Sequence, residues 1–220
     1  MSGNNHYKVW LFDFDYTLVD SSEASFMCLN YALEKCGFEK VRLEVAQKCI
    51  GYTLTEVYFQ LTGNPSPEAA IKFRKYFREK ADQIGNEYTQ LYEYVPEVLE
   101  RLQEKGIKLG IVSTKNRFRI ERFLNIAGLL DKFEVIIGGE DVMEHKPSPE
   151  PLEKAFQKFG YKKEQFLYTG DSIVDAGAAN AFGMDFTAVL SGVTPKEEFV
   201  PFKPVEIAEN LKEVTLLPSR

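Results

Sequence analysis

Five short runs of consecutive apolar residues place the strongest limit on how this chain can fold. They lie at residues 9–14, 108–113, 134–137, 165–170 and 186–190. Most are apolar on successive rather than alternate residues, which is typical of strands that are covered on both faces. Segments with helical periodicity separate the last four runs: 117–127, 149–159 and 174–182. Strands that alternate with helices predict an α/β fold with a doubly wound parallel sheet.

The distance between the first two runs departs from this alternation. Roughly ninety residues separate them, whereas the connection between neighbouring parallel strands needs only about a dozen. Four segments within the gap have helical periodicity: 24–35, 43–50, 54–61 and 67–85. We therefore predict an α/β core domain formed by residues 1–19 and 92–220, with an all-helical domain of residues 20–91 inserted into it.

Acidic side chains follow the predicted strands at their carboxyl ends, where open parallel sheets bind ligands. Asp13 and Asp15 end the first run two positions apart, so their side chains project to the same side, and Asp171 directly follows the fourth run. Three carboxylates held together repel one another unless a cation lies between them. Magnesium fits this need, because it binds one or two carboxylates and completes its shell with water and phosphate oxygens.

Groups that bind an anion are expected at the same edge of the sheet. Ser113 and Thr114 follow the second strand with a hydroxyl and a backbone N–H, and Phe14 and Asp15 offer backbone N–H groups after the first. Lys146 follows the third strand and provides a fixed positive charge. Beside a magnesium site these donors indicate phosphoryl transfer, in which one aspartate attacks phosphorus and a second acts as general acid and then as base.

Four segments occur in order along the chain: residues 13–19, Ser113, Lys146 with Pro147, and residues 170–175. In this order they resemble the four motifs of the haloacid dehalogenase superfamily of phosphatases and phosphomutases. The helical insertion between the first two segments is similar to the cap of the phosphoglycolate-phosphatase-like members. The resemblance covers nearly the whole chain, and it implies a Rossmann-like core domain with an inserted helical cap domain.

The resemblance also implies a role for each matching residue. Asp13 would be the nucleophile and a magnesium ligand. Asp15 would be the general acid and base, and its backbone carbonyl would also bind the metal. Asp171 would be the third metal ligand, and Ser113 and Lys146 would hold the phosphoryl oxygens.

Two further positions bear on this resemblance. Asp175 would orient Lys146 or a metal-bound water; the alternative from the residues alone is an acid in the first turn of a helix, where it complements the helix dipole. Tyr16 stands where related sequences usually have glycine. A bulky residue at that turn is expected to narrow the entrance to the site or to reshape the backbone.

Composition limits the partners of the chain. The 27 basic and 33 acidic residues give a formal net charge of −6, which argues against nucleic acid as a partner. No apolar run approaches the roughly 18 residues that a membrane span requires. The polar N-terminus lacks the pattern of a secretory signal, so we expect a cytoplasmic protein.

One group of basic residues is expected to form a solvated helix face: Lys72, Arg74, Lys75, Arg78 and Lys80.

These observations predict a magnesium-dependent phosphatase that hydrolyses a small phosphorylated metabolite, such as a phosphoglycolate-like monoester, through an aspartyl phosphate. A phosphomutase similar to β-phosphoglucomutase is the first alternative, followed by a nucleotidase or a pyrophosphatase of the same superfamily. A phospho-accepting receiver domain is disfavoured, because its acidic pair precedes the phosphorylated aspartate on a separate strand. The oligomeric state is open between a monomer and a homodimer.

Overall fold

The computed structural model describes residues 6–84 and 86–215. The chain forms two compact units: Met1–Val19 together with Leu91–Arg220, and Asp20–Gln90. The second unit is therefore one uninterrupted segment inserted into the first. The first five residues of the polar N-terminus lie outside the described part, as does residue 85, the predicted end of the last inserted helix.

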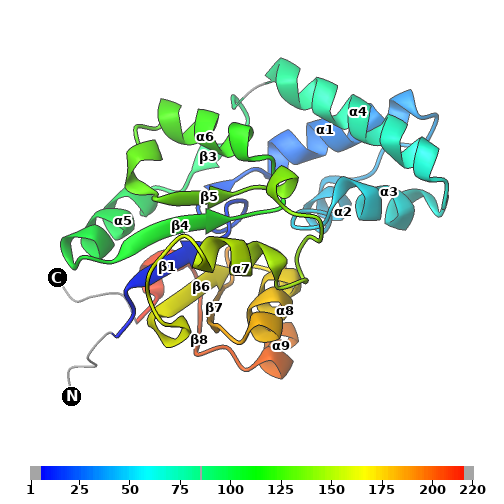
Figure 1. Ribbon diagram of the computed structural model, residues 1–220. Coiled ribbons are helices and arrows are strands. Elements are labelled where there is room, and N and C mark those ends of the chain that lie inside the picture. Colours follow the sequence, from blue (N-terminus) through cyan, green and yellow to red (C-terminus); the bar gives the residue numbers. More distant parts are fainter. Residues whose placement is uncertain (1–5, 85, 216–220) are drawn as a thin grey trace. The chain divides into compact units, whose positions relative to one another are not determined.

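The first unit is built on a six-stranded sheet (Figure 1). Its strands are β1 (Val9–Phe12), β4 (Lys108–Val112), β5 (Val135–Ile137), β6 (Phe166–Gly170), β7 (Asp185–Val189) and β8 (Glu206–Ala208). They lie in the order β5-β4-β1-β6-β7-β8, and every neighbouring pair is parallel. The predicted doubly wound α/β fold is confirmed, and each of the five predicted strands overlaps an observed one.

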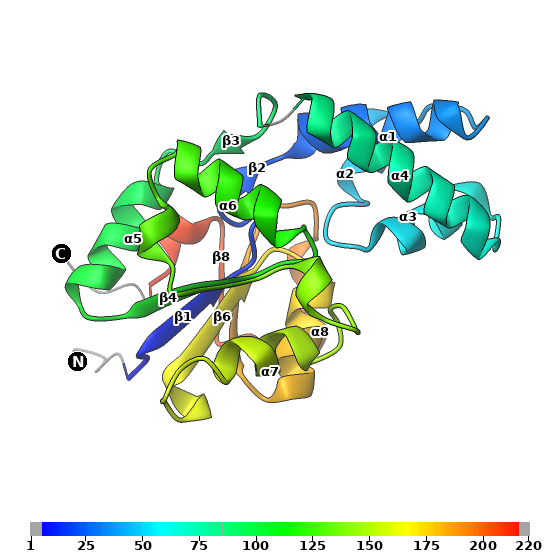
Figure 2. The same ribbon diagram turned by 45° about the horizontal axis from the view of Figure 1, so that its top comes forward.

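Helices cover both faces of this sheet, as Figure 2 shows. The helices α5 (Val95–Glu104) and α6 (Arg117–Ile126) lie on one face; α7 (Glu150–Phe156) and α8 (Ile173–Phe182) lie on the other. Strand β1 contributes to both cores, because its side chains alternate between the faces. Trp10 and Phe12 pack with residues of α5 and α6, whereas Val9 and Leu11 pack with residues of α7 and α8. Both cores therefore hold β1 in place.

The first unit contains elements that the sequence analysis did not predict. Helix α5 begins with Pro96 in its first turn, and β8 adds a short sixth strand beside β7. A small helix, α9 (Lys196–Phe199), precedes β8 and packs Phe199 into the second core. The predicted helices are confirmed as α6, α7 and α8, although α7 is shorter than its predicted range.

The inserted unit is helical, as predicted. Its helices are α1 (Ser22–Lys35), α2 (Leu43–Gln47), α3 (Leu54–Thr62) and α4 (Pro67–Ile84). They enclose a core of their own, in which the ring of Tyr58 lies 5.3 Å from that of Phe73. Thr53 starts α3 with a capping box, since its hydroxyl accepts from the backbone of Glu56 while the Glu56 carboxylate accepts from the backbone of Thr53.

The two chain segments that connect the units, β2 (Val19–Asp20) and β3 (Gln90–Leu91), pair as a two-stranded sheet. Helix α4 carries the five predicted basic residues, and three of them, Arg74, Lys75 and Arg78, line a groove of about 460 Å³ together with Ile71, Glu79 and Asp82. Acidic residues share that groove with the basic ones, as on an ordinary charged helix surface. Within residues 6–84 and 86–215, no helix combines the length and apolar character that a bilayer crossing requires.

Candidate active site

Asp13 is the first residue after β1 and lies at the carboxyl edge of the sheet. Its backbone N–H donates to the carbonyl oxygen of Thr169 at 2.9 Å, which continues the pairing of β1 with β6. Its Oδ1 accepts a hydrogen bond from the backbone N–H of Phe14 at 2.7 Å. The side chain is only 4% exposed. The carboxylate of Asp13 is therefore buried and fixed by the strand that carries it.

Lys146 lies on the loop between β5 and α7, and its side chain is 1% exposed. Its ammonium group is 3.2 Å from Oδ1 of Asp13 and 2.5 Å from Oδ1 of Asp175. It also donates to the phenol oxygen of Tyr168 at 2.9 Å and to the carbonyl oxygen of Val112 at 3.3 Å. Each of these contacts holds the lysine directly beside the carboxylate of Asp13.

Asp175 occupies the first turn of α8 and is fully buried. It closes a capping box with Ser172, whose backbone N–H donates to Oδ2 of Asp175 at 3.2 Å and whose hydroxyl also contacts that oxygen. Oδ1 of Asp175 accepts a hydrogen bond from the phenol of Tyr168 at 2.6 Å. The aspartate thus caps its helix with one oxygen and contacts Lys146 and Tyr168 with the other.

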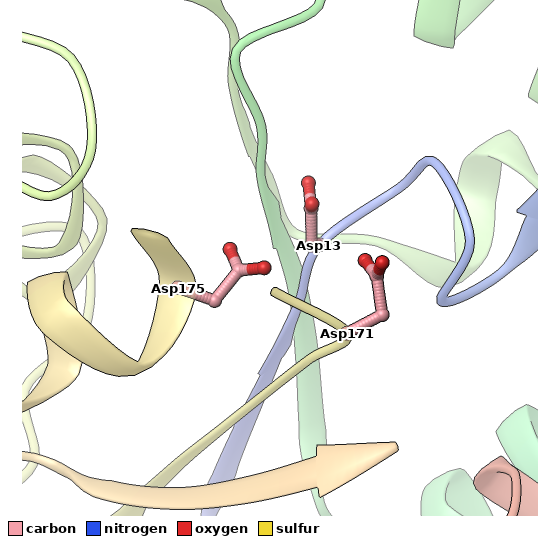
Figure 3. Close-up of side chains that lie close together, drawn as sticks. All are labelled: Asp13, Asp171 and Asp175. Carbon is pink, nitrogen blue, oxygen red and sulfur yellow. The ribbon is translucent and has the colours of Figure 1, made fainter. Parts of the chain in front are cut away.

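Asp13, Asp171 and Asp175 form a group in which one carboxylate oxygen from each residue lies within 4.8 Å of the other two. Figure 3 shows the three side chains, which come from the end of β1, from the end of β6 and from α8. The sheet brings the first two together, because Phe12 of β1 is paired with Thr169 of β6. Asp13 lies one residue and Asp171 two residues beyond this pair, so in parallel strands both reach the same edge of the sheet.

Burial and mutual repulsion raise the pKa values of these acids. Burial raises the pKa of Asp13 to about 7, and although Lys146 opposes the shift, Asp175 and Asp15 add to it. Burial, followed by the charges of Asp175 and Asp13, raises the pKa of Asp171 well above its ordinary value. Burial alone would lower the pKa of Lys146, but Asp13 and Asp175 outweigh that effect and raise it. The site therefore stabilises the lysine cation and disfavours two of the carboxylate anions.

This donor set fits a hard divalent cation. Three carboxylates face the single ammonium group of Lys146, which leaves a formal excess of two negative charges when all of the acids are ionised. Every candidate ligand is an oxygen atom, which suits magnesium better than the softer metals that prefer nitrogen or sulfur. Asp13 and Asp171 are the carboxylates best suited to the metal, because Asp175 is already engaged by Lys146, Tyr168 and Ser172.

Asp15 lies outside this group of three. Its Oδ1 is 2.7 Å from the ammonium group of Lys115, on the loop that follows β4, and the two side chains are 13% and 25% exposed. The same ammonium group lies 5.6 Å from the centre of the Phe14 ring. Two lysines thus pair with three of the four acids, since Lys146 contacts Asp13 and Asp175 while Lys115 contacts Asp15.

Ser113 and Thr114 follow β4 directly, beside the end of β1. Ser113 is buried, and its backbone N–H donates to the carbonyl oxygen of Ile137 at 3.0 Å. Its hydroxyl accepts from the backbone N–H of Lys115 at 3.4 Å. Thr114 is partly buried, and its carbonyl packs so closely on Gly139 that a Cβ atom there would lie 2.4 Å from the carbonyl oxygen.

Three residues at this edge were not predicted from the sequence. Lys115 contacts Asp15, and Tyr168 contacts both Lys146 and Asp175. Gly192, on the loop after β7, approaches Asp171 so closely that a Cβ atom would lie 2.0 Å from its Oδ2. A tyrosine inside an apolar strand and a glycine in a loop carry no polar signal of their own.

Tyr16 adopts a left-handed backbone conformation with a φ of 59° and is buried. Glycine reaches this region freely, whereas other residues pay roughly 1–2 kcal/mol for it. The carbonyl oxygen of Tyr16 accepts a hydrogen bond from the hydroxyl of Ser191 at 2.5 Å. The turn therefore has a left-handed backbone, which glycine adopts most readily, although the side chain at this position is large.

Residues 10–189 match the family model of haloacid dehalogenase-like hydrolases. The chain belongs to this family. The matched segment includes all of the acids and lysines described above, and the resemblance seen in the sequence motifs is confirmed.

Relatives and solved structures agree with this membership. Pyrophosphatase PpaX of Halalkalibacterium halodurans is 34% identical over 190 residues, which are 86% of each chain. A phosphoglycolate phosphatase of Aquifex aeolicus is 31% identical over 195 residues, which are 88% of this chain and 90% of that relative. The crystal structure of a haloacid dehalogenase-like hydrolase from Bacteroides fragilis is 42% identical, with a TM-score of 0.91 over 93% of this chain and 98% of the other.

Proposed function

We propose that this chain is a magnesium-dependent phosphatase that hydrolyses small phosphate monoesters by phosphoryl transfer to Asp13. One observation carries the proposal: the buried carboxylate of Asp13 lies 3.2 Å from the buried ammonium group of Lys146 and shares its surroundings with Asp171. A carboxylate in such a setting has a cation on one side to hold a phosphoryl oxygen and a further acid on the other to bind metal.

Magnesium would be held by the carboxylates of Asp13 and Asp171 and by the backbone carbonyl of Asp15. When bound, the cation would offset the repulsion among the buried carboxylates and stabilise negative charge on the phosphoryl group. We assign the hydroxyl of Ser113, the backbone N–H of Thr114 and the ammonium group of Lys146 to the phosphoryl oxygens. Asp175 then serves to orient Lys146, with which it is in direct contact.

The reaction proceeds in two steps. In the first, an oxygen of Asp13 forms a bond to phosphorus as the bond to the ester oxygen breaks, and Asp15 gives a proton to that leaving oxygen. In the second, Asp15 takes a proton from water, and the water oxygen attacks phosphorus. The aspartyl phosphate is thereby cleaved, which releases inorganic phosphate and restores the free carboxylate of Asp13. The inserted helical unit is proposed to act as the cap that selects the substrate.

A pyrophosphatase is the second candidate function, because the chain is 34% identical to a relative named pyrophosphatase PpaX. A phosphoglycolate phosphatase that is 31% identical supports a carboxylated monoester instead. Pyrophosphate and phosphoglycolate both present a terminal phosphoryl group to the same nucleophile. They differ in the leaving group, which is phosphate for pyrophosphate and glycolate for phosphoglycolate.

The test is a screen of phosphate release from phosphoglycolate, pyrophosphate, nucleotides and sugar phosphates, with magnesium or with a chelator. We expect release to require magnesium and to fall to background in Asp13→Asn. The matched control is Asp131→Asn, which changes an exposed aspartate of the same unit. Unchanged turnover in Asp13→Asn would refute the mechanism, and isomerised sugar in place of free phosphate would identify a phosphomutase.

A further inference from the structure

The ion pair between Asp15 and Lys115 joins two residues that are 100 positions apart in the sequence. Within the described part of the chain, Lys115 is the one hydrogen-bonding partner of the Asp15 carboxylate, and it contacts Oδ1. The side chains are 13% and 25% exposed, so solvent screens this pair less than a fully exposed one. The other oxygen of Asp15, Oδ2, is left available for a further contact.

Backbone hydrogen bonds fix both ends of this pair. The N–H of Lys115 donates to the hydroxyl of Ser113 at 3.4 Å, and its carbonyl oxygen accepts from the N–H of Gly139 at 3.0 Å. Asp15 lies in the tight turn after β1, where Tyr16 N–H donates to the carbonyl oxygen of Val19 at 2.7 Å. The backbone of Lys115 is therefore anchored at one strand end and that of Asp15 at the neighbouring one, and the 2.7 Å contact joins their side chains.

The pairing also keeps Asp15 apart from the three buried acids. A free carboxylate beside Asp171 and Asp13 would compete for the same cations, namely Lys146 and the metal. Because the ammonium group of Lys115 pairs with Asp15, the position of the Asp15 side chain does not depend on Lys146 or on the metal. A group that transfers a proton must lie within hydrogen-bond reach of the reacting oxygen, so a fixed orientation directly affects rate.

We propose that Lys115 is a positioning residue that holds Oδ1 of Asp15 so that Oδ2 exchanges the proton with the leaving oxygen. The inference rests on the proposed phosphatase function. In the first step the proton on Oδ2 passes to the ester oxygen as its bond to phosphorus breaks. In the second step a proton of water returns to Oδ2 as the water oxygen bonds to phosphorus. Lys115 keeps its contact with Oδ1 throughout and neither gains nor loses a proton.

The test compares two substrates that share charge and differ little in size, phenyl phosphate and p-nitrophenyl phosphate. Phenolate is the more basic leaving group, so its departure depends more strongly on protonation by Asp15. For phenyl phosphate we expect Lys115→Met to lower kcat/KM by about 10- to 100-fold, which is part of the roughly 100- to 10,000-fold that general acid catalysis contributes. For p-nitrophenyl phosphate we expect a fall of less than about threefold, and Lys115→Arg is expected to restore most of the activity.

Lys108→Met is the matched control. Lys108 forms a lysine–carboxylate pair of similar length, 2.8 Å to Glu134, at the opposite end of β4, so its loss leaves both kcat/KM values unchanged. A double-mutant cycle separates positioning from direct substrate binding. In the Asp15→Asn background, Lys115→Met should have little further effect. Thermal unfolding shows which variants are folded. Lys115→Gln serves as a second neutral replacement, and its kcat/KM is measured with both substrates.

Different results overturn the two proposals. If the wild type hydrolyses neither compound with magnesium present, the phosphatase function fails. If the wild type is active and both neutral replacements of Lys115 leave its activity unchanged, the positioning role fails. Equal losses for the two substrates, or an undiminished loss in the Asp15→Asn background, would also refute positioning and would indicate that Lys115 contacts the substrate.

Discussion

The phenol oxygen of Tyr168 lies 2.9 Å from the ammonium group of Lys146, inside the sheet edge that carries the candidate nucleophile. Tyr168 is fully buried, and its hydroxyl also reaches Oδ1 of Asp175 at 2.6 Å. The tyrosine therefore contacts both members of the Lys146–Asp175 ion pair. Asp13 contacts only one of them, Lys146, so Tyr168 and Asp175 together hold the cationic neighbour of Asp13 in place.

Replacement of this tyrosine should affect both stability and rate. Tyr168→Phe removes the hydroxyl and leaves Lys146 with one fewer partner, so we expect the free energy of unfolding to fall by about 1–2 kcal/mol. We expect kcat to fall as well, since Lys146 loses a fixed orientation. Urea denaturation and steady-state kinetics measure the two effects. Tyr161→Phe, at a partly buried tyrosine of the same unit, should change neither.

Without metal, the buried acids should make the wild type less stable than a variant in which one of them is neutral. Burial and the neighbouring charges raise the pKa of Asp171, so its anion is disfavoured at neutral pH. In the presence of a chelator, Asp171→Asn should therefore raise the unfolding temperature by about 2–4 °C. Magnesium should raise that temperature in the wild type but much less in the variant. A lower unfolding temperature for Asp171→Asn in chelator would contradict this expectation, and Asp131→Asn provides the control.

Gly192 should be essential for the position of Asp171. A Cβ atom at Gly192 would lie 2.0 Å from Oδ2 of Asp171, so Gly192→Ala must displace the carboxylate or the loop. We expect the magnesium concentration for half-maximal activity to rise by about 10-fold or more. Gly160→Ala is the matched control, because a Cβ atom there meets nothing within 4 Å. An unchanged magnesium requirement in Gly192→Ala would argue against Asp171 as a ligand.

Glu150 stabilises the loop that carries Lys146, and this stabilisation depends on pH. Its carboxylate accepts from the backbone N–H groups of Met143 and Glu144 at 3.0 and 2.7 Å, and these bonds lower the pKa of Glu150 to about 2. Because the folded-state pKa is depressed, this stabilisation is present above the ordinary pKa of 4.5 and is lost as the pH falls towards 2.

Glu150→Gln should therefore lower the unfolding temperature at pH 7, and the difference from the wild type should shrink as the medium becomes more acidic. Unfolding temperatures measured across the acid range test this, and an NMR titration reports the pKa of Glu150 directly. The control is Glu153→Gln, at an exposed position of the same helix. A difference that grows with acidity would contradict the assigned direction of the pKa shift.

The parallel sheet could be predicted from the sequence, because continuous apolar runs such as residues 108–113 indicate strands that are covered on both faces. The sequence was insufficient for β8, which has only three residues and includes Glu206. Helix α5 was also missed, although Val95, Val98, Leu99 and Leu102 have helical spacing and are all buried. This helix begins only three residues after the predicted domain boundary at residue 92.

The site was predictable to the extent that its residues carry charge at strand ends. Asp13, Lys146, Asp171 and Asp175 were all named from the sequence, and the structure brings them together. The partners of these residues were not predictable. A pair such as Asp15 and Lys115 is determined by the register between two strands, which local sequence patterns do not contain.

Strand β1 is buried at every residue and is paired on both sides, by β4 and by β6. Its backbone therefore exchanges amide hydrogens only when the whole unit opens, as in the most protected strands of other proteins. The candidate nucleophile Asp13 directly follows this strand, in a part of the molecule with little freedom to move. Its neighbour Lys146 instead lies on the loop between β5 and α7, so a movement of that loop would change the surroundings of Asp13 without moving Asp13 itself.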